Sequence, residues 1–437
     1  MTGQDAILDH LTTLFREHEA SLNGRSASAY HRFQQNSFRA LGQLTFPDRK
    51  NEDWKYTSVQ KLLAPKYTIA RSNPNLGLSD IPGLTSYVIT CTNGQLDPLR
   101  IAPGLISKGV KVIPLSEAIN LPSWTTRFES RINMDKANSN QTFDLLNFSF
   151  NANGFFIDIP DGLILDAPIE VRIIHDDTTL AFSHPLYFIH AGQLSQVTLF
   201  ERFEHPAGNG SLPTEGLINT LVMIHVDKGG QFRHIKWQDL PPSQSMVYQL
   251  KVIQQQDSHF ETLAFDHGGQ TIRNNVEADM VESNTYTSLL GGYMAKGKQS
   301  MDHQTKINHH VHHCESHEQY KGIVDDQASA AFNGKVYVHP DAQKTNAYQQ
   351  NDTLVLSPNA VMNSKPQLEI FADDVKCSHG ATIGQMDERA LFYLQSRGLK
   401  PEQARSILKS AFLAQIIDLI PDEIIREYIA DHLSITL

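Results

Sequence analysis

The chain has 437 residues, of which 40% are hydrophobic, and its formal net charge at pH 7 is −11. This length allows two or three domains with a large core. The acidic balance argues against a nucleic-acid-binding protein, because a basic surplus is needed to displace counterions from a polyanion. No run approaches the ~20 apolar residues of a membrane span, so we expect neither nucleic acid nor a membrane among its partners.

The cysteine content and the N-terminus predict the cellular compartment. The chain has three cysteines, Cys91, Cys314 and Cys377, which lie far apart in the sequence. An odd number of widely spaced cysteines does not fit a disulfide framework and favours reduced thiols. The first residues are charged early and lack the apolar block of a secretory signal. We therefore expect a cytoplasmic protein in which Cys91 is a core residue.

Two helices are predicted at the N-terminus, the second ending near Gly42. Apolar residues recur in both at a spacing of three and four, which is the pattern of one buried helix face. The first helix presents Ile7, Leu8, Leu11, Leu14 and Phe15, and the second presents Tyr30, Phe33, Phe38 and Leu41. Pro47 then ends the helical pair.

A charged and aromatic run follows, Glu52-Asp53-Trp54-Lys55-Tyr56-Thr57. On its residues alone it is a surface turn with an aromatic anchor. We assign it to the packing of the N-terminal domain rather than to chemistry. Short strands are predicted at residues 87–91, which the Asn93-Gly94 turn closes, and at residues 110–115.

From residue 154 to about residue 384 the chain consists of short apolar runs without a helical period of useful length. Turn dipeptides such as Gly229-Gly230, Gly268-Gly269 and Asn333-Gly334 separate them. A long series of short strands without helices predicts a sandwich, a barrel or a solenoid of stacked coils. The strand spacing is too loose for a strict repeat, so the residues leave these three architectures open.

A histidine-rich tract lies within this region: Asp302-His303, then His309-His310-Val311-His312-His313-Cys314-Glu315-Ser316-His317. Imidazoles and a thiol are common ligands of borderline metal ions. The spacing matches neither a zinc finger nor the H-E-x-x-H helix signature. This favours histidines exposed on the surface of a coil over a metal site.

A second candidate site lies at residues 365–398. A short strand at residues 368–370 precedes the carboxylates Asp373 and Asp374 and then Cys377-Ser378-His379-Gly380. In an extended segment Cys377 and His379 share one face, so both can ligate one soft or borderline metal ion such as iron. One thiolate and one imidazole do not complete a tetrahedral site, so the remaining ligands have to come from a partner or from sulfide.

Helices are predicted again beyond residue 385. Asp387-Glu388 suits a helix start, Gly398 suits a helix end, Pro401 suits a first turn, and Pro421-Asp422-Glu423 begins a last helix. The expected apolar stripe of the middle helix consists of Ala404, Ile407, Leu408, Ala411, Phe412, Gln415 and Ile416. Such helices can cap the last strands with one face and meet a partner with another.

Several motifs carry a resemblance to a known family. The run KPQLEIFADDVKCSHGAT at residues 365–382 and the run ALFYLQSRGL after it resemble the D-type members of the SufB/SufD family, subunits of the SUF iron–sulfur cluster assembly system. The run at residues 52–57 resembles the E-x-W-K/R-Y-T sequence of the same family. The tract also matches the D-type pattern at Asp302, Thr305, His309, His313, Cys314, Ser316 and Tyr320-Lys321-Gly322, whereas His310, His312 and His317 are particular to this chain.

The resemblance implies an architecture and partners. It selects the solenoid, a right-handed parallel β-helix at residues 154–384, between an N-terminal α/β domain at residues 1–153 and a helical subdomain at residues 385–437. It implies a scaffold subunit that pairs with SufB through the β-helix and with the ABC-type ATPase SufC through the C-terminal helices. The contacts expected there are Leu391, Phe392, Tyr393, Arg397 and Gly398. The isolated chain can also form a homodimer.

The resemblance also implies a site. In the family, the histidine that matches His379 is implicated at the SufB–SufD interface, and the cysteine that matches Cys377 lies near it. We therefore expect His379, with Cys377 as a companion, to bind a transient iron ion or iron–sulfur cluster shared with the partner. No tightly bound cofactor is expected.

Two other classes of function remain as alternatives. The sequence contains neither a G-x-x-x-x-G-K-S/T loop nor a G-x-S-x-G elbow, so ATP hydrolysis is expected in a partner and not in this chain. One alternative is a polysaccharide-active β-helix enzyme that uses Asp325-Asp326 or Asp373-Asp374. Adjacent aspartates on a strand point to opposite faces, which weakens this alternative. The other is a free-standing metalloenzyme that uses the histidine tract.

Overall fold

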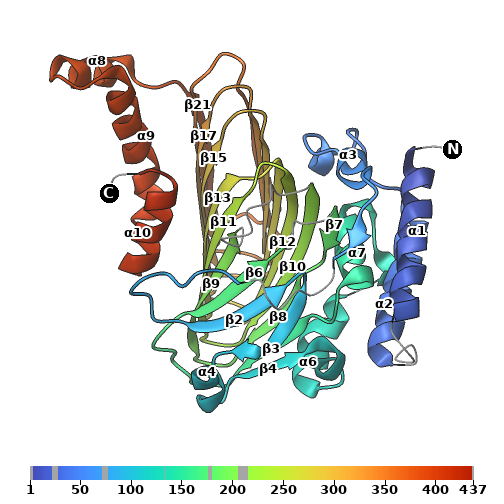
Figure 1. The fold of residues 1–437 in the computed structure, drawn as a ribbon. Helices are drawn as coiled ribbons and strands as arrows, with labels where there is room; N and C mark the ends of the chain where they lie inside the picture. Colours follow the sequence, from blue (N-terminus) through green and yellow to red (C-terminus); the bar gives the residue numbers. More distant parts are fainter. Residues whose placement is uncertain are drawn as a thin grey trace.

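The computed structural model describes residues 3–21, 28–70, 77–132, 134–175, 180–204 and 215–435. From β10 (Gly216–Val226) to β19 (Asn346–Val355), consecutive strands alternate between two sheets, and each strand pairs in parallel with the strand two places earlier and with the strand two places later. This pattern defines a parallel β-helix (Figure 1) and excludes the sandwich and the barrel. The architecture that the family resemblance implied is therefore confirmed.

We call the two walls of the β-helix sheet A and sheet B. In spatial order, sheet A contains β20 (Val361–Ile370), β18 (Ser329–Val338), β16 (Ser300–His309), β14 (Thr271–Met280), β12 (Gln244–Gln254), β10 (Gly216–Val226), β8 (Leu186–Ala191), β5 (Phe155–Ile159) and β4 (Lys111–Pro114), with β7 (Ala181–Ser183) and β1 (Thr68–Ile69) off this path. Sheet B contains β21 (Lys376–Gly384), β19 (Asn346–Val355), β17 (Glu315–Val324), β15 (Tyr286–Ala295), β13 (His259–Gly268), β11 (Gln231–Leu240), β9 (Gln196–Glu204), β6 (Ile169–Ile174), β2 (Tyr87–Thr92) and β3 (Gln95–Ile101).

The length of one turn varies along the β-helix. Thr271 pairs with Ser300 and Ser300 with Ser329, so these two turns advance the chain by equal steps. The step from Met246 to its partner Ile272 is shorter, whereas the step from Ser329 to its partner Val361 is longer. The loops between strands absorb these differences, which is why no strict repeat is visible in the sequence.

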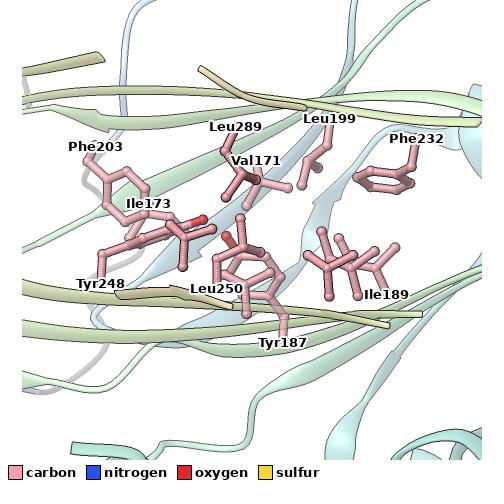
Figure 2. Close-up of a cluster of buried hydrophobic side chains, with 14 of the residues drawn as sticks. Val171, Ile173, Tyr187, Ile189, Leu199, Phe203, Phe232, Tyr248, Leu250 and Leu289 are labelled. Carbon is pink, nitrogen blue, oxygen red and sulfur yellow. The ribbon is translucent and has the colours of Figure 1, made fainter. Parts of the chain in front are cut away.

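The two sheets enclose the main apolar core. Figure 2 shows side chains of both walls pointing toward each other, among them Val171 and Leu199 from sheet B and Tyr187 and Leu250 from sheet A. We call this interior the lumen. Because successive residues of a strand point to opposite faces, every second residue of each strand lines the lumen and the others point outward.

The N-terminal region covers the outer face of sheet A (Figure 1). Its helices are α1 (Gly3–Ser21), α2 (Ala29–Gln43), η2 (Glu52–Trp54), α3 (Val59–Leu63), α4 (Pro103–Ser107), α5 (Leu115–Ala118), α6 (Pro122–Phe128), η3 (Glu129–Arg131), η4 (Met134–Lys136), η5 (Ser139–Gln141) and α7 (Thr142–Phe150). The two predicted helices correspond to α1 and α2, and the strands predicted at residues 87–91 and 110–115 correspond to β2 and β4. Cys91 is fully buried, as expected of a core residue.

The strands β2, β3 and β4 precede residue 154 but belong to the two sheets. β2 pairs in parallel with β6, and β4 pairs antiparallel with β5. Both walls of the β-helix thus continue across residue 153. The division into domains at residues 1–153, 154–384 and 385–437 stays a prediction.

The C-terminal helices are α8 (Glu388–Ser396), α9 (Pro401–Ile417) and α10 (Glu423–His432). α9 and α10 cover the outer face of sheet B on the other side of the molecule (Figure 1). Ile416 and Ile429 pack in one cluster with Trp237 and Phe265 of the sheet. At one edge of this contact, Tyr428 donates a hydrogen bond of 2.6 Å to Glu204.

The predicted stripe of α9 is partly wrong. Its buried residues are Ala404, Ser410, Leu413, Ile416 and Ile417, whereas the predicted Ile407, Ala411 and Gln415 are exposed. The helix starts and ends, in contrast, are confirmed. Asp387 and Asp422 cap α8 and α10 with their side chains, and Gly398 has a φ of +96° just after α8. No described helix combines the length and the apolar character that crossing a bilayer requires.

Candidate functional site

One end of the β-helix is open. In the described sheets, β20 and β21 are the terminal strands of sheets A and B, and they pair with β18 and β19. Exposed apolar side chains gather here, namely Val361, Ile370, Phe371 and Ile383. A terminal strand presents unpaired N–H and C=O groups that can pair with another chain, and an apolar patch beside it marks an interaction surface. We call this end the mouth of the lumen.

Cys377 and His379 lie on β21 at the mouth. Cys377 is in register with Ala347 of β19, and His379 is in register with Gln349. Both partners are buried, and Cys377 packs against the cluster that contains Ala347. The two site residues therefore share the lumenal face of β21, as the sequence predicts. Cys377 is half-buried, and His379 is exposed.

The chemistry of this pair is incomplete within the chain. Burial raises the pKa of the Cys377 thiol, so the sulfur is protonated at neutral pH unless a cation or a metal ion approaches it. Among the described residues, no three His, Cys, Asp or Glu side chains come together in a way that could hold a metal ion. The role of His379 and Cys377 as ligands stays a prediction.

The histidine tract is distributed over different faces. His303 and His309 are buried, and the His309 ring bonds Ser316 Oγ at 2.9 Å. His310 pairs with Asp279 at 2.8 Å, while His312 and His313 are exposed and His317 is half-buried. The expectation of exposed histidines thus holds for His312 and His313 but is wrong for His303 and His309. His303 and His309 point into the lumen, because they alternate along β16 with residues that face outward.

The acidic pairs of the enzyme hypothesis lie in two different turns. Asp325 accepts a hydrogen bond from Ser357, and Asp326 accepts one from the Gly297 N–H at 2.9 Å. Asp374 forms an ion pair with Lys344. These contacts stabilise the turns after β17 and after β20, and they supply no observation that favours glycoside chemistry.

The predicted partner contacts of the C-terminus lie on α8. Every residue of α8 is exposed or half-buried, and the helix extends away from the sheets beside the start of α9 (Figure 1). Phe392 is 74% exposed and Tyr393 is 54% exposed, and the Arg397 guanidinium lies 5.3 Å from the Tyr393 ring centre. Leu391 is half-buried, and Gly398 follows the helix. The arrangement presents an aromatic surface that a partner can cover.

The aromatic run at residues 52–57 packs as predicted. Trp54 is buried, stacks on Phe143 and lies 3.8 Å from the Arg273 guanidinium. Arg273 pairs with Asp302 at 2.7 Å, and Thr57 donates a 2.5 Å hydrogen bond to the same carboxylate. This contact fixes the N-terminal region on the outer face of sheet A.

A polar pocket of about 450 Å³ adjoins Trp54 and Arg273. The lysines that line it include Lys251 and Lys306, which form ion pairs with Asp144 and Glu277. Sequence reasoning missed this pocket. The one signal that points toward it is the tryptophan of the aromatic run.

Comparison with known proteins identifies the family. The SufBD core domain of SUF system FeS cluster assembly matches residues 173–412, and the N-terminal region of SufBD proteins matches residues 6–171. An iron–sulfur cluster assembly SufBD family protein of Synechocystis is 29% identical over 414 residues, covering 92% of this chain and 90% of the relative.

Two further relatives match nearly the whole chain. The chloroplastic protein ABCI7 of Arabidopsis thaliana is 28% identical over 429 residues, covering 96% of this chain and 88% of the relative. The iron–sulfur cluster assembly protein SufD of Escherichia coli is 26% identical over 415 residues, covering 94% and 93%. The parallel β-helix, the open mouth and these matches agree, and the chain belongs to the SufBD family of the SUF iron–sulfur cluster assembly system.

Proposed function

We propose that this chain is the D-type subunit of a cytoplasmic SUF complex, a non-catalytic scaffold that pairs with a SufB-type β-helix and a SufC-type ATPase. Membership of the SufBD family supports a role in iron–sulfur cluster assembly. The scaffold role agrees with the absence of a nucleotide-binding loop from the sequence. The pairing with a SufB-type β-helix and with a SufC-type ATPase rests on two surfaces, the mouth of the lumen and α8.

The observation that carries the proposal is the position of His379 and Cys377 on the terminal strand β21. A second parallel β-helix can continue both sheets at β20 and β21 and cover the exposed apolar side chains of the mouth. His379 and Cys377 then face the partner's lumen and contribute two ligands to iron or to a growing cluster. A cluster that takes its remaining ligands from the partner can leave when the two subunits separate.

The second surface is α8 with the exposed Phe392 and Tyr393. In the proposal this surface binds the ATPase, and α9 and α10 connect it to the outer face of sheet B. A movement of the ATPase is thereby transmitted to the wall of the β-helix that carries His379. This connection gives ATP hydrolysis a physical route to the shared site.

The test replaces the ligand and leaves the strand intact. In the assembled complex, His379→Ala is expected to lower cluster formation by about tenfold or more, because loss of even an outer-shell partner of a metal site costs 10–100-fold. Ser378→Ala is the matched control, since Ser378 is the neighbouring residue on the opposite face of β21 and is exposed. Cluster formation is measured in cells and by iron content of the purified complex.

If the complex with His379→Ala assembles and gives a normal cluster yield, the role of His379 as a ligand is refuted. Cys377→Ser is expected to have a smaller effect, because Cys377 is half-buried whereas His379 is exposed at the mouth. A chain that binds no SufB-type partner when the two are co-expressed would refute the scaffold assignment independently of the site.

A further inference from the structure

A column of polar side chains runs down the lumen beneath His379. On successive turns of sheet B, Leu289 is in register with Glu318, Glu318 with Gln349, and Gln349 with His379. Glu318 is 0% exposed and Gln349 is 3% exposed. The carboxyl group of Glu318 and the amide of Gln349 therefore lie buried directly under the predicted ligand His379. Two apolar side chains at these positions would fill the core equally well.

The amide of Gln349 is held on two sides. Its Nε2 donates a 2.6 Å hydrogen bond to Glu318 Oε2. On the facing wall, Gly334 of β18 leaves the space that the amide occupies, because a Cβ at Gly334 would collide with Gln349 Nε2. The orientation of the amide is thus fixed by one hydrogen bond below it and by a missing side chain opposite it.

The carbonyl oxygen of the same amide lacks a hydrogen-bond donor in the part of the chain that the structure describes. Gln349 Oε1 is buried and has no hydrogen-bond partner among the described residues. Leaving a buried acceptor without a hydrogen bond costs about 1–3 kcal/mol. The unpaired oxygen of Gln349 therefore calls for an explanation. The next residue along the column, one strand spacing of about 4.8 Å away, is His379.

We propose that Gln349 is a positioning residue for His379, which accepts the imidazole N–H on Oε1 while Glu318 holds the amide in place. Ligating histidines almost always donate their second ring N–H to an acceptor of the protein, which selects the tautomer and aims the ligating nitrogen. With one ring N–H directed down to Gln349, the other ring nitrogen points out of the mouth, toward the ligands of the partner. This inference rests on the proposed role of His379 as a ligand.

The test uses the assembled complex with Co²⁺ as a spectroscopic probe. Gln349→Leu removes the acceptor at similar volume and is expected to weaken Co²⁺ binding 10–100-fold. In the metal-free complex, the ¹⁵N signals of His379 are expected to change from a single tautomer to a mixture. The double variant Glu318→Gln with Gln349→Glu exchanges the two groups, keeps an acceptor under His379, and is expected to restore both readouts to within about threefold of the native complex.

Asn351→Leu is the matched control. Asn351 is a buried amide two residues along the same face of β19, and it donates to Ser364 Oγ at 2.9 Å rather than facing His379. It is expected to leave the Co²⁺ affinity and the His379 signals unchanged. An equal loss in Asn351→Leu, or a double variant that restores nothing, would show general damage to the lumen and overturn the inference.

The two proposals fail differently. If His379→Ala leaves Co²⁺ binding unchanged, the ligand role fails and the positioning role fails with it. If His379→Ala weakens binding but Gln349→Leu does not, His379 stays a ligand and only the role of Gln349 is refuted.

Discussion

Buried polar residues of the lumen explain why many strands could not be predicted. Lys236 is 0% exposed and bonds Asp266 at 2.5 Å, and His234 bonds the buried Glu201 at 2.5 Å. In β14, whose sequence is TIRNNVEADM, the lumenal Asn274 takes part in this network and interrupts the apolar series of the same face, which consists of Ile272, Val276, Ala278 and Met280. Hydrophobic alternation marks a strand only where the buried face is apolar. The same reason hid Glu318 and Gln349, whereas the Cys-Ser-His-Gly run could be recognised from its residue types.

Glu318 makes the stability of the fold dependent on pH. Burial raises the pKa of its carboxyl group from the ordinary 4.5 to about 7. The folded chain therefore binds one more proton than the unfolded chain between these values, and stability falls as the pH rises through this window. Glu318→Gln cannot ionise, so its free energy of unfolding is expected to gain up to about 3 kcal/mol relative to the native chain between pH 4.5 and pH 8.

Urea unfolding at pH 4.5, 6 and 8 measures this difference. Burial raises the pKa of Tyr320 on the same strand and lowers the pKa of His303 on the facing wall. Both groups are present in the native chain and in Glu318→Gln, so their contributions cancel when the two chains are compared. Glu315→Gln is the control, since it removes an exposed carboxylate of the same strand and leaves the buried carboxyl group of Glu318 in place. A constant difference between Glu318→Gln and the native chain would contradict the prediction.

At the scale of elements, local signals located the helix ends and missed the buried faces. Asp387, Gly398, Pro401 and Asp422 mark starts and ends because capping depends on the residue itself. The buried face of α9 was placed on the wrong residues, since the spacing of apolar residues gives a period but the contact with sheet B and α10 decides the rotation of the helix. The helix α7 was missed altogether, because all its residues are buried and such a helix shows no polar face.

The structure changes how the proposed contact with an ATPase has to be tested. A truncation after Gly398 would remove α9 and α10 and expose Trp237 and Phe265, which these helices cover. A substitution on α8 avoids this damage. Phe392→Ser is expected to weaken ATPase binding by tenfold or more, as for an aromatic residue at the centre of an interface, and to leave the melting temperature unchanged.

Pull-down of the ATPase together with a thermal melt checks this prediction. Leu99→Ser is the matched control, because Leu99 is 95% exposed on β3, far from α8 along sheet B, and it is expected to bind the ATPase normally. Full ATPase binding by Phe392→Ser would show that α8 is not the docking surface.

At the scale of the molecule, the two ends of the β-helix differ. At the N-terminal end, sheet A finishes with β4 and sheet B with β3, both short and antiparallel to their neighbours, and such strands limit further pairing. At the other end, β20 and β21 are ten and nine residues long and parallel to their neighbours. Sequence periodicity could not show this difference, because pairing partners are set by the stacking of whole turns. The family resemblance supplied the β-helix where the residues alone left three architectures open.

This asymmetry predicts which side of β21 meets the partner. Ile383 is in register with the lumenal Thr353 and is 52% exposed at the mouth, whereas Thr382 is exposed on the outer face of the strand. If a second β-helix covers the mouth, a lysine at position 383 becomes buried without a partner, which costs several kcal/mol. Ile383→Lys is therefore expected to weaken binding of the SufB-type partner at least 100-fold, since a loss of about 1.4 kcal/mol already corresponds to a factor of ten. Thr382→Lys keeps its charge in solvent and is expected to change binding less than threefold.

Titration calorimetry with the purified partner measures both affinities, and thermal melts confirm that each variant chain is folded. Equal effects of the two lysines would place the interface elsewhere, and weak binding by Thr382→Lys alone would place it on the outer face of sheet B.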